Sequence, residues 1–207
     1  MKVSLSKIIG AIASMVLAGA SFSANASPIQ FIFTGVGSGS LGGVGFSDTA
    51  FVFTAFGDTA SAQSCWSGST TCTFIASSSA EVSLSGIGNY DFLTGTRTFD
   101  NNGFVGFSRY ELFNRSDLYN VFNVGSAYDM ASPIGPVSGN ASLLQWSNGT
   151  VSTTGGALVF NSASTSGTFQ AVMVTAVPEP ETYAMLLAGL GLVGSVARRR
   201  KQKNATV

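Results

Sequence analysis

Short apolar runs separated by turn-forming residues make up most of the chain between residues 27 and 176. The runs are rich in Phe, Val, Ile and Thr, which favour strands, and clusters of Gly, Ser and Asn interrupt them at short intervals. The expected strands contain residues 30–34, 50–56, 72–76, 80–85, 96–99, 120–124, 157–160 and 167–174. This pattern predicts an all-β fold, a single antiparallel β-sandwich domain of jelly-roll-like type.

The order of apolar and polar positions within the runs predicts which strand faces are buried. Val82 and Leu84 alternate with polar neighbours, so we expect this strand to bury one face only. Residues 51–56 are apolar at almost every position, which indicates a central strand between two layers.

Two Asn-Gly pairs favour tight hairpins. Asn102-Gly103 should join strands that end near Asp100 and begin near Phe104, and Asn148-Gly149 should join residues 143–147 with the segment from Val151 onward. Residues 109–119 are the most charged part of the body, and a short surface helix or a long structured loop is expected there.

A short repeat occurs ten residues apart, with Phe46-Ser-Asp48 echoed by Phe56-Gly-Asp58. We expect both aspartates to cap or turn the chain at the two ends of one strand, with both phenylalanines in the core. The alternative, a cation site formed by the two carboxylates, requires the chain to fold back, because ten extended residues span about 30 Å.

The N-terminal residues have the three regions of a secretory signal peptide. Two lysines precede an apolar run over residues 8–22, and Ala24-Asn-Ala26 forms an A-x-A site before Ser27. We therefore expect residues 1–26 to be removed by signal peptidase after Ala26, which makes an uncleaved N-terminal anchor the weaker alternative.

The C-terminal residues form three blocks in a fixed order. A Pro/Glu block precedes an uncharged apolar run over residues 182–197, and a basic cluster follows it. Sixteen residues would span about 24 Å as a helix, which is marginal for a bilayer core of about 30 Å. The basic cluster should stop the helix and hold this end in the cytoplasm.

This arrangement resembles the PEP-CTERM protein-sorting tail of exported bacterial proteins. The resemblance covers about residues 176–203, and its motif positions are Val177, Pro178, Glu179, Pro180, Arg198, Arg199 and Arg200. It implies an exosortase as the partner that recognises and removes the tail, after transient insertion of a transmembrane helix in the inner membrane. An ordinary tail anchor with a proline-rich stalk is the alternative.

Residues 27–176 would then form the mature domain, which is a usual size for one domain. This segment has three arginines, no lysine and eight acidic residues, a net charge of −5. An acidic domain without lysine has no electrostatic footprint for nucleic acid, so we expect no nucleic-acid partner.

Cys65 and Cys72 are the two cysteines of the chain. An exported chain passes through an oxidising compartment, so we expect them to form a disulfide that closes a short turn. Their spacing does not fit a redox or zinc motif, and no histidine is present to complete a metal site. We expect neither a metal nor a cofactor.

The absence of histidine also excludes Ser-His-Asp and Cys-His catalytic arrangements. Paired carboxylates could still form a glycosidase site, and Asp91, Glu111 and Asp117 are candidates because each lies near a tyrosine. Nothing in the sequence marks one pair out, so we expect no catalytic residues and a protein that is not an enzyme.

Trp66 and Trp146 are the candidate glycan contacts, because a flat aromatic face can stack on a sugar ring. Trp66 lies inside the expected disulfide turn, whereas Trp146 could equally belong to the core. The sequence predicts an exported protein of the cell surface or extracellular matrix, associated with the exopolysaccharide of a biofilm and structural or adhesive in role. The alternatives are a carbohydrate-binding module and a surface polysaccharide hydrolase.

Overall fold

The computed structural model describes residues 27–66, 68–69, 71–111, 116–122, 124, 128–174 and 186–194. The chain divides into two compact units, one ending at Val174 and the other beginning at Thr175. The described part of the second unit is a helix over residues 186–194.

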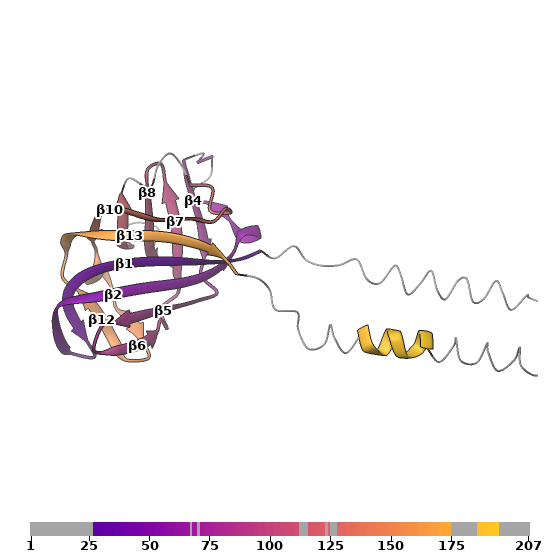
Figure 1. Cartoon of the computed structure of the whole chain (residues 1–207). Coiled ribbons are helices and arrows are strands. Elements are labelled where there is room, and N and C mark those ends of the chain that lie inside the picture. The colour runs from indigo at the N-terminus through magenta and orange to yellow at the C-terminus, as the bar shows by residue number, and fades with distance from the viewer. Residues whose placement is uncertain are drawn as a thin grey trace, which may run out of the picture. The chain divides into compact units, whose positions relative to one another are not determined.

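The first unit consists almost entirely of strands (Figure 1). Two short 3₁₀ helices, η1 (Thr59–Ser61) and η2 (Trp146–Asn148), interrupt them. The strands are β1 (Pro28–Leu41), β2 (Val44–Asp58), β3 (Gln63–Ser64), β4 (Cys72–Ala76), β5 (Ser79–Leu84), β6 (Gly88–Asp91), β7 (Thr96–Asn101), β8 (Phe104–Arg109), β9 (Asp117–Phe122), β10 (Ile134–Leu143), β11 (Val151–Thr153), β12 (Gly156–Phe160) and β13 (Ala163–Met173). The all-β prediction is confirmed.

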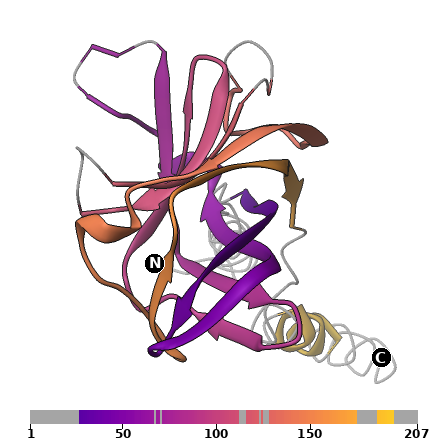
Figure 2. The same ribbon diagram turned by 90° about the vertical axis from the view of Figure 1, so that its left-hand side faces the viewer.

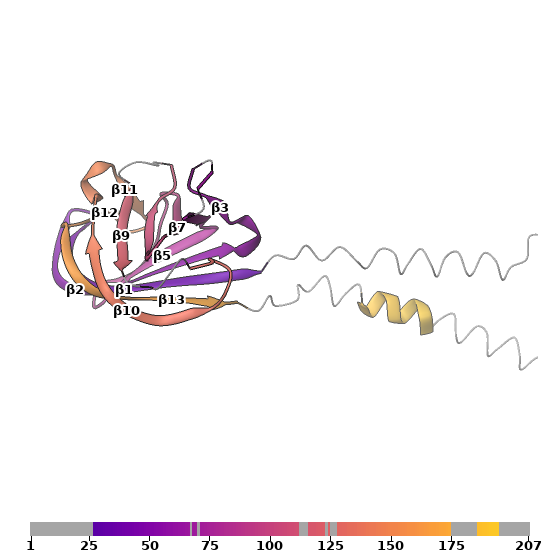
Figure 3. The same ribbon diagram turned by 90° about the horizontal axis from the view of Figure 1, so that it is seen from above.

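The strands form one continuous antiparallel sheet that curls over itself. Its order is β3-β4-β7-β8-β9-β10-β13-β1-β2-β5-β6, with β12 paired to β1 and β11 paired to β12. Strands β13, β1 and β2 run across the direction of β4, β7 and β8 (Figure 1), and β9 runs across β13 and β1 (Figure 3). Figure 2 shows the same curled sheet from the left-hand side of Figure 1. The two layers expected of a sandwich are therefore parts of a single sheet.

Aromatic contacts across the interior hold the two layers together. Phe53 on β2 stacks on Phe107 on β8 with ring centroids 5.1 Å apart, although four strands separate β2 from β8 in the sheet order. Phe33 on β1 also contacts Phe107, at 6.1 Å. Phe33 and Phe53 are both fully buried. Contacts between aromatic rings add to the free energy gained from burying the apolar surface of the rings.

The predicted strand faces agree with this core only in part. In β5, Val82 and Leu84 are buried and the alternating residues Glu81 and Ser83 are only half-buried, which confirms the one-sided strand. Strand β2 lies between β1 and β5 within the sheet. The prediction that residues 51–56 lie between two layers is wrong, because Val52 and Phe56 are on the outer face of the curled sheet and are only half-buried.

The hydroxyl of Tyr119 forms a hydrogen bond across the interior, from β9 to the backbone of β1. Tyr119 on β9 is fully buried, and its hydroxyl donates a hydrogen bond of 2.8 Å to the carbonyl oxygen of Thr34 on β1. Gly35 and Gly167 leave the space for this hydroxyl, since a Cβ on either would overlap it.

Burial raises the pKa of Tyr119, and burial together with the nearby Asp129 raises that of Tyr128.

One of the two predicted hairpins is confirmed. Asn102 and Gly103 have φ angles of 39° and 118°, and they join β7 directly to its partner β8. The hairpin predicted at Asn148-Gly149 is wrong, because β10 pairs with β9 and β13 while β11 pairs with β12. Here the chain forms η2 instead, which carries the Trp146 side chain into the core.

The expectation of a helix or loop over residues 109–119 is also partly wrong. Arg109 ends β8, and β9 begins at Asp117, with residues 112–115 outside the described part of the chain. Leu118 and Tyr119 are fully buried. Because these two side chains are buried in the core, residues 117–119 belong to β9 and not to a surface helix or loop.

The two aspartates of the short repeat have different structural roles. Asp58 ends β2 as predicted, and its carboxylate accepts a hydrogen bond of 2.9 Å from the Ala60 backbone to cap η1. Asp48 does not lie at a strand end. It lies within β2, with φ 47°, opposite the register shift between Gly37 and Gly39 of β1. The bulge lets these long strands bend.

Helix 186–194 falls within the apolar run of the tail. Among the residues that the structure covers, no helix combines the length and the apolar character needed to cross a membrane. The transmembrane helix was expected over residues 182–197, of which the structure describes residues 186–194. The remaining residues of that run lie outside the described part.

Candidate functional site

The outer face of β4, β7, β8 and β9 carries a second, smaller group of buried side chains. Phe74 on β4 and Phe99 on β7 are paired in register, and both point away from the main core. Cys72 is buried with them, and Cys65 and Phe104 pack against the group. The outer side of this layer is therefore partly covered.

The predicted disulfide between Cys65 and Cys72 is confirmed, with the two Cα atoms 5.4 Å apart. It links the residue after β3 to the first residue of β4, and the Cys65 backbone N–H donates to the Cys72 carbonyl at 3.1 Å. Trp66 follows the first cysteine, and 56% of its surface is exposed. The disulfide thus fixes the base of the turn that presents this indole.

A pocket of about 480 Å³ opens beside this turn. Its volume falls in the range typical of small-molecule sites, roughly 300–1,000 Å³. The lining residues come from the disulfide turn, from β7 and from β9: they are Cys65, Trp66, Cys72, Arg97, Phe99, Asn101 and Asp117. Aromatic surface, a cation, an amide and a carboxylate therefore meet in one cavity.

Arg97 is held on several sides. Its Nε donates to Ser108 Oγ at 2.9 Å, its Nη2 donates to Ser116 Oγ at 3.2 Å, and its guanidinium lies 5.2 Å from the centre of the Phe74 ring. Burial lowers the pKa of Arg97, and the negative charge of Asp117 opposes that effect. The side chain is 5% exposed, so its position is set by the protein.

Asp117 is positioned by a neighbour on its own strand. Asn120 Nδ2 donates to Asp117 Oδ2 at 3.2 Å. Asn120 Oδ1 is buried and has no hydrogen-bond partner among the residues that the structure describes. Gly106 on β8 makes room for the amide, since a Cβ there would overlap both Asn120 Oδ1 and the Phe99 ring. This part of the sheet is built around polar groups.

Trp146 is not a glycan contact. It is 1% exposed, its indole N–H donates to the Leu118 carbonyl at 2.9 Å, and its ring packs 4.9 Å from that of Phe160. The buried donor is satisfied, which is the usual requirement for a core tryptophan. The possible glycan contact at Trp146 is therefore wrong and its alternative, a core position, is confirmed, while Trp66 is exposed.

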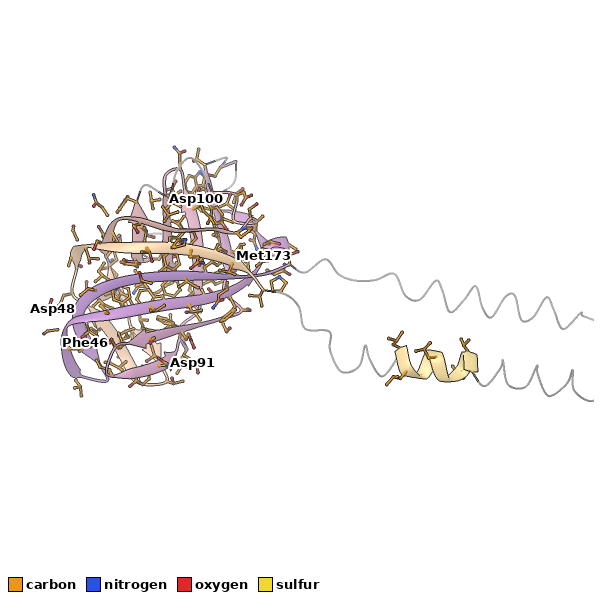
Figure 4. The ribbon with its side chains drawn as sticks, in the orientation of Figure 1. Phe46, Asp48, Asp91, Asp100 and Met173 are labelled. Atoms are coloured by element: carbon orange, nitrogen blue, oxygen red, sulfur yellow. A yellow bond between two sulfur atoms is a disulfide. The ribbon has the colours of Figure 1, made fainter. Side chains whose placement is uncertain are left out.

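The three candidate catalytic carboxylates do not line a common pocket. Asp117 lines the pocket, whereas Asp91 is exposed at the end of β6 and Glu111 is exposed after β8. Figure 4 shows Asp48, Asp91 and Asp100 on different parts of the domain. Among the described residues, no three His, Cys, Asp or Glu side chains are grouped closely enough to hold a metal ion.

A second pocket, of about 490 Å³, lies on the outer face of β10, β13, β1 and β2. Its lining includes Thr34 and Thr168, whose hydroxyls are 2.7 Å apart, together with Ser138 and Ser166. None of its lining residues is charged. Four lining residues have hydroxyl groups, but most of the exposed surface of this pocket is apolar.

Sequence reasoning did not identify Arg97 and Asn101 as site residues. Both lie in β7, where they alternate with inward-facing Thr98 and Asp100, so they share the outer face with Phe99. Sequence alternation could have placed them on one face. Only the packing of the disulfide turn shows that this face forms a pocket.

The residues expected to direct sorting and processing lie outside the described part of the chain: they are Ala24, Ala26, Val177, Pro178, Glu179, Pro180, Arg198, Arg199 and Arg200. They can be assessed only by comparison with known proteins.

No curated protein and no solved structure matches the chain. A family model, described as the PEP-CTERM protein-sorting motif, matches residues 176–201. The match contains the Pro/Glu block, the apolar run and the three arginines, and it implies an exosortase as the processing partner. The chain is thus an exported protein that carries a PEP-CTERM sorting motif at its C-terminal end.

Proposed function

We propose that this chain is delivered by an exosortase to the cell surface or extracellular matrix, where its β-domain has a structural or adhesive role in the exopolysaccharide. The observation that carries the proposal is the sorting motif over residues 176–201, which follows a compact all-β unit ending at Val174. In this proposal signal peptidase removes residues 1–26, and the exosortase then removes the C-terminal tail.

The chemistry of the β-domain supports an extracellular role. Its disulfide suits an oxidising environment, and its surface charge is low for its size. The outer face of β13 and β1 presents hydroxyl groups around Thr34 and Thr168. Such a face offers a hydrated polymer a few hydrogen-bonding groups beside apolar surface, and its lining has no charged residue that would attract nucleic acid.

The sorting proposal is tested by fractionating producing cells and reading the C-terminus of the surface form by mass spectrometry. We expect a C-terminus well upstream of Val207. Replacing Pro178, Glu179 and Pro180 with alanine should leave the tail uncut, whereas Thr182→Ala should be processed normally. A wild-type protein that ends at Val207 and stays in the inner membrane would contradict the proposal.

Carbohydrate binding is a second candidate function, favoured by the exposed indole of Trp66 at a pocket with polar walls. Exposed aromatic rings provide flat apolar surface for sugar rings. Loss of glycan binding in Trp66→Ala, with cell-surface delivery unchanged, would distinguish this function from a purely structural role.

The hydrolase alternative gains no comparable support. Glycosidases place two carboxylates on either side of the scissile bond, about 5–10 Å apart. Asp117 is the one carboxylate in the lining of the disulfide-turn pocket, and the second pocket has none. We therefore propose that the protein is not an enzyme.

A further inference from the structure

We infer that the pocket beside the Cys65–Cys72 turn binds one unit of a neutral polysaccharide, with Trp66 stacking on the sugar ring and Asn101, Asp117 and Arg97 binding its hydroxyl groups. The inference rests on the carbohydrate-binding candidate function and gives it a site and a ligand class. Its support comes from the shape, charge and rigidity of the pocket.

The walls combine the two kinds of surface that a sugar ring presents. A pyranose has an apolar face of C–H groups and a rim of hydroxyls, each of which can donate and accept hydrogen bonds. Trp66 provides an exposed flat ring, and Phe99 adds apolar surface. Asp117 can only accept, Arg97 can only donate, and Asn101 can do both. Adjacent hydroxyls on one ring can contact all three.

The charges of the pocket favour a neutral ligand. One guanidinium and one carboxylate line it, so their charges nearly cancel. The surrounding domain is acidic, with a net charge of −5 over residues 27–176. A uronate or sulfated chain would meet this field as well as Asp117, and like charges repel. A neutral polysaccharide is repelled neither by the net charge of the domain nor by Asp117.

The polar groups are held in place before any ligand binds. Ser108 and Ser116 fix the Arg97 guanidinium, and Asn120 fixes the Asp117 carboxylate. The disulfide restrains the turn that carries Trp66. Side chains that are already ordered lose little conformational entropy on binding, which raises affinity for a flexible polymer.

The polar cluster also needs an explanation that packing alone does not provide. Burying a guanidinium and a carboxamide costs free energy, and apolar residues of similar volume often stabilise a fold as well as buried ionic groups do, or better. Arg97 and Asn120 are 5% and 4% exposed, on the outer face of a sheet whose inner face is apolar. Binding a hydroxyl-rich ligand accounts for polar groups at this position.

The test uses protein isolated from the surface fraction of producing cells. Its mobility is compared in native gels containing dextran, hydroxyethyl cellulose or alginate, of which the first two are neutral and the third is a polyuronate. Acrylamide quenching of tryptophan fluorescence is measured in the same samples. Because Trp146 is buried and Trp66 exposed, quenching reports mainly on Trp66.

At least one neutral polysaccharide should retard the wild-type protein and protect Trp66 from acrylamide, and alginate should do neither. Trp66→Ala and Asn101→Ala should each raise the apparent dissociation constant, measured from the retardation, about tenfold, the loss expected for one good contact. Trp66→Phe should raise this constant by less than Trp66→Ala does. Leu93→Ala, which shortens another exposed apolar side chain outside the pocket, should behave as wild type.

Three outcomes would overturn the inference. Stronger retardation by alginate than by the neutral chains would exclude the ligand class. Retardation that survives both Trp66→Ala and Asn101→Ala would place glycan binding elsewhere and leave the candidate function intact. No retardation by any of the three would remove both the inference and the carbohydrate-binding candidate, while exosortase sorting would stand on its own fractionation result.

Discussion

The buried hydroxyl of Tyr119 gives a sharp test of how the two layers of the curled sheet are joined. It donates to the Thr34 carbonyl, and a Cβ on Gly167 would overlap it. We predict that Gly167→Ala and Tyr119→Phe will destabilise the fold non-additively. The double variant should be more stable than the sum of the two single effects implies.

The magnitudes follow from the contacts. Tyr119→Phe removes one buried hydrogen bond and should cost about 1–2 kcal/mol. Gly167→Ala displaces the hydroxyl, which adds overpacking of about 1–3 kcal/mol to the loss of the same bond. With the hydroxyl already gone, the bond is not lost twice and the closest overlap disappears, although the new Cβ still stands 2.7 Å from the Thr34 carbonyl oxygen. The coupling free energy should therefore be at least about 1 kcal/mol.

Urea unfolding of the four proteins, followed by circular dichroism, measures the free energies of unfolding. Gly57→Ala is the matched control, because its Cβ would stand 2.5 Å from Ile75 Cγ2 and does not approach Tyr119. Combined with Tyr119→Phe, it should be additive within about 0.5 kcal/mol. Additivity of Gly167→Ala with Tyr119→Phe to the same tolerance would refute the packing argument.

Three further predictions concern stability. Trp146→Ala should lower the free energy of unfolding by about 3–5 kcal/mol and Trp66→Ala by less than about 0.5 kcal/mol, and equal losses in urea unfolding would contradict their assigned environments. Replacing both cysteines with serine should lower the free energy of unfolding by up to about 2.5 kcal/mol, the chain-entropy value for so short a loop. An unchanged urea midpoint would show that the disulfide does not stabilise the fold. Above about pH 10 stability should fall, because tyrosines in the unfolded chain lose protons that buried Tyr119 and Tyr128 retain, by about 1.4 kcal/mol per pH unit for each. Thermal melts that coincide at pH 9 and pH 11 would argue against this burial.

The strands and one hairpin could be predicted because their causes are local. Alternation at Val82 and Leu84 reflects one-sided burial, and Asn102-Gly103 adopts the positive φ angles that such pairs favour. The Asn148-Gly149 prediction failed because a nonlocal effect was stronger. Burying Trp146 against Phe160 and the Leu118 carbonyl determined the path of that segment.

The candidate site could be predicted only in part. The disulfide and the exposure of Trp66 follow from cysteine spacing and from the difficulty of burying a short crosslinked turn. The polar partners could not be inferred, because Arg97 and Asp117 are twenty residues apart and meet only when β7, β8 and β9 pair. Their approach depends on strand register, which no local pattern encodes.

By itself the sequence determined the strand-rich class of the domain, the short disulfide turn and the sorting tail, because strand propensity, cysteine spacing and a linear motif are each local properties of the chain. The tertiary structure decided that one sheet curls to make both layers, and it decided which tryptophan is buried. It also brought a cation, an amide and a carboxylate to one pocket. These results depend on contacts between residues that are distant in the chain. Such contacts stabilise the fold only when all the strands have paired and the core is packed.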